Sequence, residues 1–205
     1  MSEYSAYIWA RLYNAIGNEY GTAGLMGNLQ AESGLIPYRL QGDFSQGYTK
    51  SISYTNKVNN GEITRYTFIH DSKGYGLAQW TYYSRKENYY DYMQGYSSIG
   101  DVAGAVSFLI QELQNSYPSV WSTLVSATDI ATPSNAVLHD FENPQEQGPD
   151  VEIYRQGLGT AIYNEYATGG DVPIPVPPEP PTPTVSPWIY GAVSDLMRRK
   201  VIYRH

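Results

Sequence analysis

The sequence TAGLMGNLQAESG, which runs from Thr22 to Gly34, sets the interpretation of the rest of the chain. Thr22 is suited to the N-cap of a helix, and Gly34 is suited to end that helix just past its last turn. Leu25 and Leu29 are spaced i, i+4, and Glu32 follows Leu29 by three residues. This spacing predicts a helix that carries Glu32 on the stripe facing the core.

Two effects favour the protonated form of Glu32 in such a helix. Burial disfavours the charged carboxylate, and the negative end of the helix dipole disfavours a second negative charge. A half-buried Glu that keeps its proton near neutral pH is what a general acid requires. The alternative is a Glu that caps a neighbouring backbone or pairs with an Arg, and this stretch alone is compatible with both.

Composition narrows the class of protein. The 205 residues suffice for one compact domain with additional material. Cys is absent and only 3 His are present, well separated, so we expect no metal site and no cofactor. The net charge of -7 argues against nucleic acid as a partner. The 21 Tyr are suited to stacking on sugar rings, although we expect most of them to be strand or core residues.

The N-terminal sequence MSEYSAYIWARLYNAIG lacks a basic start followed by a continuous apolar run. We therefore expect no secretory signal peptide. We also expect no stable membrane insertion, because the sequence contains no apolar stretch long enough to span a bilayer.

Most of the chain is predicted to be helical. Apolar residues recur at helical spacing over residues 4–20, 84–94, 101–113, 119–125, 133–141 and 149–166. Residues 42–71 differ, because SISYT and ITRYTFI are rich in β-branched and aromatic residues and VNNGE between them is a turn signal. The predicted fold class is therefore α+β, mostly helical with a small antiparallel β-hairpin or sheet.

The segment GYGLAQWT, residues 74–81, combines two glycines with three residues suited to ligand contact. The glycines predict a backbone bend or a close approach. A Gln79 amide can bind an acetamido or hydroxyl group, and Tyr75 and Trp80 lie beside it, Trp80 with a flat face for stacking. The alternative is a tight turn that leads into a core helix.

Four further charged residues lie on predicted helices. Glu112 and Glu142 are each possible catalytic partners, but we expect surface carboxylates. For Arg85 and Arg155 we expect structural ion pairs with buried acids.

The composition changes after residue 168. GGDVPIPVPPEPPTPTV is proline-rich and predicts a semi-rigid, extended spacer. The predicted organisation is a catalytic domain at 1–168, a linker at 169–187 and a short basic segment at 188–205. That last segment is suited to contact a partner protein, an anionic membrane or an anionic wall polymer, or it is the start of another module or a disordered tail.

Taken in order, these motifs resemble the phage tail-type lysozyme family of the lysozyme-like superfamily. The resemblance rests on NLQAESGL, GYGLAQWT followed by Arg85-Lys86, Gln111-Glu112-Leu113 and the later FENP at Phe141–Pro144. It covers roughly residues 4–166, and the proline-rich spacer resembles the modular layout of phage endolysins. The resemblance implies a lysozyme-like fold, with the small β region beside the cleft.

The resemblance implies cleavage of bacterial peptidoglycan glycan strands, with Glu32 protonating the glycosidic oxygen and Gln79 beside it in the cleft. A hydrolase needs a second carboxylate, at ~6.5–9.5 Å for inversion or ~5–5.5 Å for retention, whereas a lytic transglycosylase can use one Glu and a sugar hydroxyl. Asp43 and Asp71 are the candidates for the second acid, with Asp43 preferred. The predicted catalytic residues are thus Glu32 and Asp43. The predicted substrate contacts are Asp71, Tyr75, Gln79 and Trp80.

Two other functions remain open from the sequence. One is a glycan-binding module that kept the cleft and lost the chemistry, and the other is a structural component of a phage tail tip. If the protein is an enzyme, whether hydrolase or transglycosylase, we expect it to be made in the host cytoplasm without a signal peptide. We expect it to act on the wall after release or as part of a tail. A peptidase has little support, because no Cys–His pair or zinc triad is recognisable.

Overall fold

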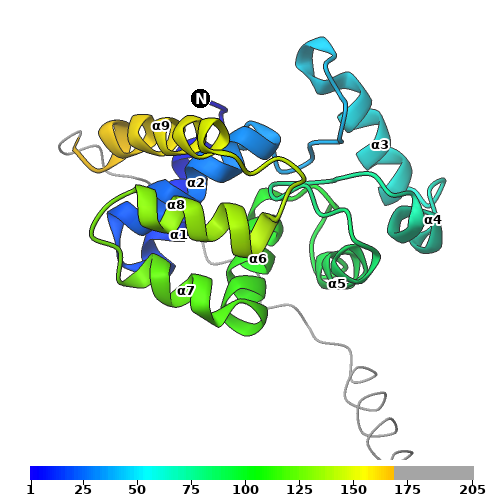
Figure 1. Cartoon of the computed structure of the whole chain (residues 1–205). Coiled ribbons are helices and arrows are strands. Elements are labelled where there is room, and N and C mark those ends of the chain that lie inside the picture. Colours follow the sequence, from blue (N-terminus) through cyan, green and yellow to red (C-terminus); the bar gives the residue numbers. More distant parts are fainter. Residues whose placement is uncertain (169–205) are drawn as a thin grey trace, which may run out of the picture.

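The computed structural model describes residues 1–168, and most of them are helical (Figure 1). The predicted linker at 169–187 and basic segment at 188–205 lie outside the described residues. The elements in chain order are α1 (Ser5–Ile16), α2 (Glu19–Ser33), the 3-10 turn η1 (Gln46–Tyr48), α3 (Thr49–Asn59), α4 (Arg65–His70), α5 (Tyr83–Met93), α6 (Val102–Ser116), α7 (Pro118–Val125), α8 (Ala131–Ala136), the π-helical turn η2 (Val137–Glu142) and α9 (Pro149–Tyr166).

Helix α2 is the central element of the fold. It contacts α1, α7, α8, η2 and α9, and every residue from Gly21 to Leu29 is buried. The predicted single core-facing stripe is therefore wrong, because neighbours cover this part of α2 on all sides. Glu32 lies in the last turn, where the helix leaves the core.

Glycines allow the neighbouring helices to approach α2 closely. A Cβ atom added at Gly27 would lie 2.6 Å from the Arg155 carbonyl oxygen and 2.6 Å from the Gly159 nitrogen on α9. Real side chains do not reach such distances, so α2 and α9 touch backbone to backbone at this point. The contact brings the middle of α9, with Arg155, against α2.

The ends of α2 differ in part from the prediction. The N-cap is Asn18, whose Oδ1 accepts a 3.0 Å hydrogen bond from Gly21 N. Thr22, the predicted cap, is buried inside the helix and donates its hydroxyl to Asn18 O. Gly34 ends the helix as predicted, with a φ of 67° that is unfavourable for residues with a side chain.

The predicted β-hairpin in residues 42–71 is wrong. SISYT lies within α3, and most of ITRYTFI forms α4. In the described part of the chain, β pairing is limited to isolated bridges that join Tyr75 to Leu40 and to Trp80. The buried residues of α3 follow helical spacing, and their burial outweighs the β preference of the Thr, Ile and Tyr side chains: Ser51, Tyr54, Thr55 and Val58. The predicted turn does fall between the two helices, at Asn60 and Gly61.

Helices α5, α6 and α7 agree closely with the predicted ranges, whereas the helix predicted over residues 4–20 ends at Ile16 and the last two residues of that range belong to α2. Asp101 caps α6 as expected and accepts hydrogen bonds from Ala103 N and Gly104 N. Helix α9 has the predicted bounds, Pro149–Tyr166. The predicted 133–141 helix is divided between α8 and η2, whose π turn carries Phe141 and Glu142.

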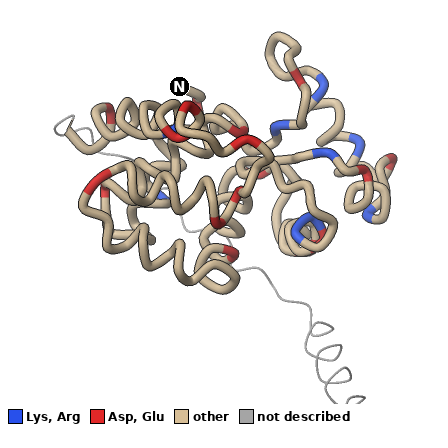
Figure 2. Tube along the Cα trace, viewed as in Figure 1, with Lys and Arg blue, Asp and Glu red and all other residues tan. Residues whose placement is uncertain are grey.

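The helices form two groups joined by α6. Helices α3, α4 and α5 lie on one flank in Figure 1, and α6 contacts α5 as well as α1 and α7 of the other group. Figure 2 shows that most Lys and Arg residues of the described chain lie on the α3–α5 flank or in the loops beside it. In the group around α2, most of the charged side chains are acidic. Arg155 is therefore a cation in acidic surroundings.

Candidate active site

Glu32 is the part of the site that opens to solvent. Its side chain is 22% exposed at the end of the buried helix α2. Its Oε1 accepts a 2.5 Å hydrogen bond from Nη2 of Arg155, which reaches across from α9. The half-buried carboxylate predicted from the sequence is therefore present, and it is paired with an arginine.

The same guanidinium holds a second carboxylate. Nη1 of Arg155 donates to Oε2 of Glu142 and, at 3.0 Å, to Oδ1 of Asn28. Asn28 is itself fixed, because its amide nitrogen donates to Ser134 O on α8. These contacts join α2, η2 and α9. We call the three residues Glu32, Arg155 and Glu142 the Arg155 cluster.

Glu142 lies deeper than Glu32, with a side chain only 3% exposed. Burial and the negative charge of Glu32 raise the pKa of Glu142 to about 8, against the opposing effect of Arg155. Its Oε1 is buried without a hydrogen-bond partner among the described residues. Burial and the neighbouring charge therefore favour the protonated form of Glu142, and the prediction of a surface carboxylate is wrong.

Arg155 stays charged within this cluster. Burial acts to lower the pKa of Arg155, but the two carboxylates outweigh it and the pKa is raised. The predicted structural ion pair of Arg155 with a buried acid is confirmed, although one of its two partners is the predicted catalytic residue.

A second buried network connects the GYGLAQWT loop to η2. Glu112 accepts hydrogen bonds from Trp80 Nε1 at 2.8 Å and from Arg85 Nε at 2.7 Å. Nη1 of Arg85 also donates to Phe141 O at 3.3 Å, one residue before Glu142. The predicted ion pair of Arg85 is confirmed, whereas Glu112 is buried and not a surface residue.

The loop that carries Gln79 is bound to the segment that follows α2. Gly76 N donates to Arg39 O at 2.8 Å, and Gln79 Nε2 donates to Arg39 O at 3.1 Å and to Gly76 O at 3.0 Å. These bonds use both amide hydrogens of Gln79. The Gln79 carbonyl oxygen has no partner among the described residues and is free to accept a hydrogen bond from a ligand.

Two predicted substrate contacts are buried beneath this loop. Tyr75 is fully buried and its hydroxyl shares a 2.6 Å hydrogen bond with Thr55 Oγ1. Trp80 is buried and stacks on Tyr89 at 4.5 Å between ring centroids. Their side chains pack in the core and support the loop from below, so a direct ligand contact would require them to move.

Asp43 is buried and fully hydrogen-bonded. It accepts bonds from both the backbone nitrogen and the hydroxyl of Ser45 and of Ser51. Burial acts to raise the pKa of Asp43, but these four hydrogen bonds outweigh it and hold the pKa below its usual range. Asp43 thereby fastens the loop after α2 to the start of α3.

Asp71 is also engaged by neighbours. It accepts a 2.5 Å bond from Lys86 Nζ, a bond from the Tyr54 hydroxyl and a 3.0 Å bond from Lys73 N. Burial lowers the pKa of Lys86, while Asp71 acts in the opposite direction. Together with Tyr54, this pair joins α3, α5 and the loop after α4.

The loop before α3 presents an exposed surface next to the end of α2. Phe44 is 90% exposed, and the Arg39 guanidinium lies 4.6 Å from the Tyr48 ring centroid. The Tyr48 hydroxyl lies beside Gly34, two residues after Glu32. An open pocket is lined by Arg39, Phe44 and Tyr48 among others. Exposed aromatic faces of this kind are suited to stacking on sugar rings.

The family model for phage tail lysozymes matches residues 3–166, which include α2, the GYGLAQWT loop, η2 and α9. The chain belongs to the phage tail lysozyme family. The family predicted from the motifs is thereby confirmed, and membership indicates peptidoglycan-lytic activity in general terms. In the comparisons with curated proteins and with solved structures, no protein matches this chain significantly.

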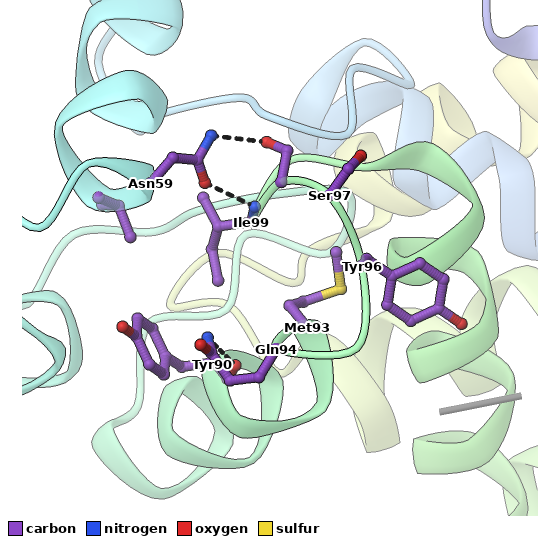
Figure 3. Close-up of a pocket in the computed structure, with 9 residues that line it drawn as sticks. Asn59, Tyr90, Met93, Gln94, Tyr96, Ser97 and Ile99 are labelled. Carbon is purple, nitrogen blue, oxygen red and sulfur yellow. Dashed lines mark hydrogen bonds between the residues drawn. The ribbon is translucent and has the colours of Figure 1, made fainter. Parts of the chain in front are cut away.

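A second pocket of this phage tail lysozyme shares no lining residue with the Arg155 cluster. It is lined by residues of α3, α5 and the loop after α5, including Val58, Asn59, Tyr90, Met93, Tyr96 and Ile99. Figure 3 shows the Asn59 amide bridging to this loop, with a 2.9 Å bond to Ser98 Oγ and another from Ile99 N. None of its lining residues is Asp, Glu, Lys or Arg, so it offers no acid for glycosidic chemistry.

Residues 1–168 show neither a cluster of metal ligands nor a membrane-spanning helix. In this part of the lysozyme, no three His, Cys, Asp or Glu side chains gather as metal ligands would. No helix between residues 1 and 168 has both the length and the apolar composition to cross a membrane.

Proposed function

We propose that this phage tail lysozyme cleaves the glycan strand of bacterial peptidoglycan, with Glu32 as the general acid. The observation that carries the proposal is the position of Glu32. It is the member of the Arg155 cluster that opens to solvent, while its partners Arg155 and Glu142 are almost fully buried. A general acid must reach the glycosidic oxygen and must also be held in a fixed direction, and this arrangement supports both.

Neighbouring groups support a glycan as the ligand. The free carbonyl oxygen of Gln79 can accept a hydrogen bond from the N–H of an acetamido group or from a hydroxyl. Phe44 and Tyr48 offer apolar faces for sugar rings beside the end of α2.

We further propose that the lysozyme acts by the mechanism that needs one carboxylate. The second acid predicted from the sequence, Asp43, already accepts four hydrogen bonds and is fully buried, which disfavours its use as a base or nucleophile. Asp71 is similarly engaged by Lys86 and Tyr54. In a lytic transglycosylase a hydroxyl of the sugar itself attacks, so no second acid is required.

The general acid is tested with Glu32→Gln on purified peptidoglycan, by counting new glycan ends. Gln keeps an acceptor for Arg155 but cannot give a proton, so we expect a loss of about 100-fold or more with unchanged melting temperature. Glu87→Gln, which alters an exposed carboxylate of α5 paired with Arg65, is the control and should keep full activity. Near-full activity of Glu32→Gln would refute the proposal.

The same assay separates the other functions. A wild-type protein that binds peptidoglycan without producing new ends would be a binding module or a structural tail-tip component. Mass spectrometry of the released muropeptides identifies the bond and the mechanism: anhydro ends are expected, whereas reducing ends would assign a hydrolase.

A further inference from the structure

We propose that Glu142 is a positioning residue that keeps one proton within the Arg155 cluster. When that proton passes to Glu32, the ionised Glu142 balances the charge of the shared arginine and Glu32 can act as the acid. The inference rests on the proposed role of Glu32 and adds the device that controls its protonation. It is argued from the contacts of the Arg155 cluster.

A problem arises if Arg155 and Glu32 are considered as a pair. Nη2 of Arg155 lies 2.5 Å from Oε1 of Glu32, and a guanidinium at this distance stabilises an ionised carboxylate. A general acid must instead enter the reaction protonated. An arginine bound to Glu32 alone would therefore oppose the chemistry.

Glu142 supplies the missing compensation. It faces the same guanidinium through Nη1, while Glu32 faces it through Nη2. Two carboxylates and one guanidinium are electrically neutral when they hold a single proton. Two carboxyl groups that face one guanidinium can hold one proton between them, on either carboxyl. When the proton is on Glu32, the ionised Glu142 is the partner of Arg155.

The contacts of Glu142 show why a proton is retained in the pair. Its Oε1 is buried with no partner among the described residues, and leaving a charged oxygen in that state is costly. Burial and the charge of Glu32 both raise the pKa of Glu142. The deep carboxyl thus holds the proton at rest, and the exposed carboxyl of Glu32 is the one that can pass it to a substrate.

Other charged groups near Glu142 are already compensated. Arg85 on α5 acts on Glu142, but it is bound to Glu112 of α6. On η2 itself, His139 faces Glu152 of α9 and Gln147, and Asp140 is exposed. The sequences of α7 and α8 contain no charged residue. Apart from burial, the protonation of Glu142 is therefore controlled by Glu32 and Arg155.

The first test is the pH dependence of lysis. In Glu142→Gln, Arg155 acts on Glu32 alone, so the alkaline limb of the activity profile should move to lower pH by about one to three units. Glu142→Gln combined with Arg155→Met should move the limb back, because the unbalanced cation is gone. Glu112→Gln, the matched change at the other buried Arg–Glu pair, should leave the limb in place. A uniform loss in Glu142→Gln without a shift would overturn the inference.

A second test needs no change at Glu142. Carboxyl carbon NMR of the glutamate-labelled protein should give a pKa of about 8 for Glu142 in the wild type. The value should be lower in Glu32→Gln, because the charge of Glu32 is removed. An unchanged value would overturn the inference even if Glu32→Gln is inactive, whereas an active Glu32→Gln would overturn the proposed function instead.

Discussion

Arg155 binds three side chains of the site. It donates to Glu32, Glu142 and Asn28 from a position that is nearly closed to solvent. Removing it would leave two neighbouring carboxylates without a counter-charge. We therefore expect Arg155 to contribute to the free energy of unfolding as well as to the chemistry of the site.

We expect Arg155→Met to reduce the free energy of unfolding by about 3–5 kcal/mol, because it breaks a buried ion pair and leaves its partners uncompensated. Urea denaturation measures the change. The control is Arg65→Met, which breaks an exposed pair with Glu87 and Asp91 and should cost about 1 kcal/mol or less. Equal costs for the two variants would contradict the buried role of Arg155.

Asp43 gives a prediction about pH. Its pKa is lowered in the folded state from an ordinary value of 3.8, so its stabilisation is complete above pH 3.8 and is lost as the pH falls below it. We expect Asp43→Asn to cost about 1–3 kcal/mol at pH 7, because the Asn amide keeps only one acceptor oxygen and the donors of either Ser45 or Ser51 lose theirs. Urea denaturation at pH 7 and pH 3 should show the cost shrinking in acid. A cost that is the same at both pH values would contradict this account.

At the scale of elements, sequence periodicity predicted the helices where local signals agree. Helix α9 has Pro149 in its first turn, and α6 has Asp101 as its cap, so spacing and end signals point to the same bounds. The hairpin predicted for residues 42–71 was wrong because β-branched and aromatic residues favour a strand locally. In α3 the burial of Tyr54 and Val58 at helical spacing decides the outcome instead.

Helix α2 itself was predicted, but its surroundings were not. Its three glycines at 21, 24 and 27 look like weak points of a helix in the sequence, whereas each of them faces another backbone or side chain in the fold. The spacing of Glu32 from Leu25 and Leu29 predicted that its carboxylate is half-buried. Its partners Glu142 and Arg155 were not assigned to it, because only the packing of α9 brings them to α2.

The contact between α2 and α9 gives a prediction at this scale. We expect Gly27→Ala to cost about 1–3 kcal/mol and to lower lytic activity, because the new methyl group forces α9 and its Arg155 away from α2. On the same helix pair, Gly157→Ala meets no atom within 4 Å and should stabilise α9 by about 0.5–1 kcal/mol. Melting temperatures of the two variants measure the contrast. A neutral Gly27→Ala would show that the helices have room to separate.

At the scale of the whole molecule, the site draws on both ends of the described chain. Glu32 and Arg155 are 123 positions apart in the sequence. The family match from residue 3 to residue 166 includes both of them. Motifs that are weak separately therefore become specific together, because one folded unit requires all of them.

This separation has a consequence for synthesis. A ribosome that has made the first half of the chain has already released Glu32, yet the guanidinium that orients it has not been translated. A nascent chain, or a fragment cut anywhere before residue 155, would carry the acid without its support. By this account, the Arg155 cluster can form only after residue 155 has left the ribosome.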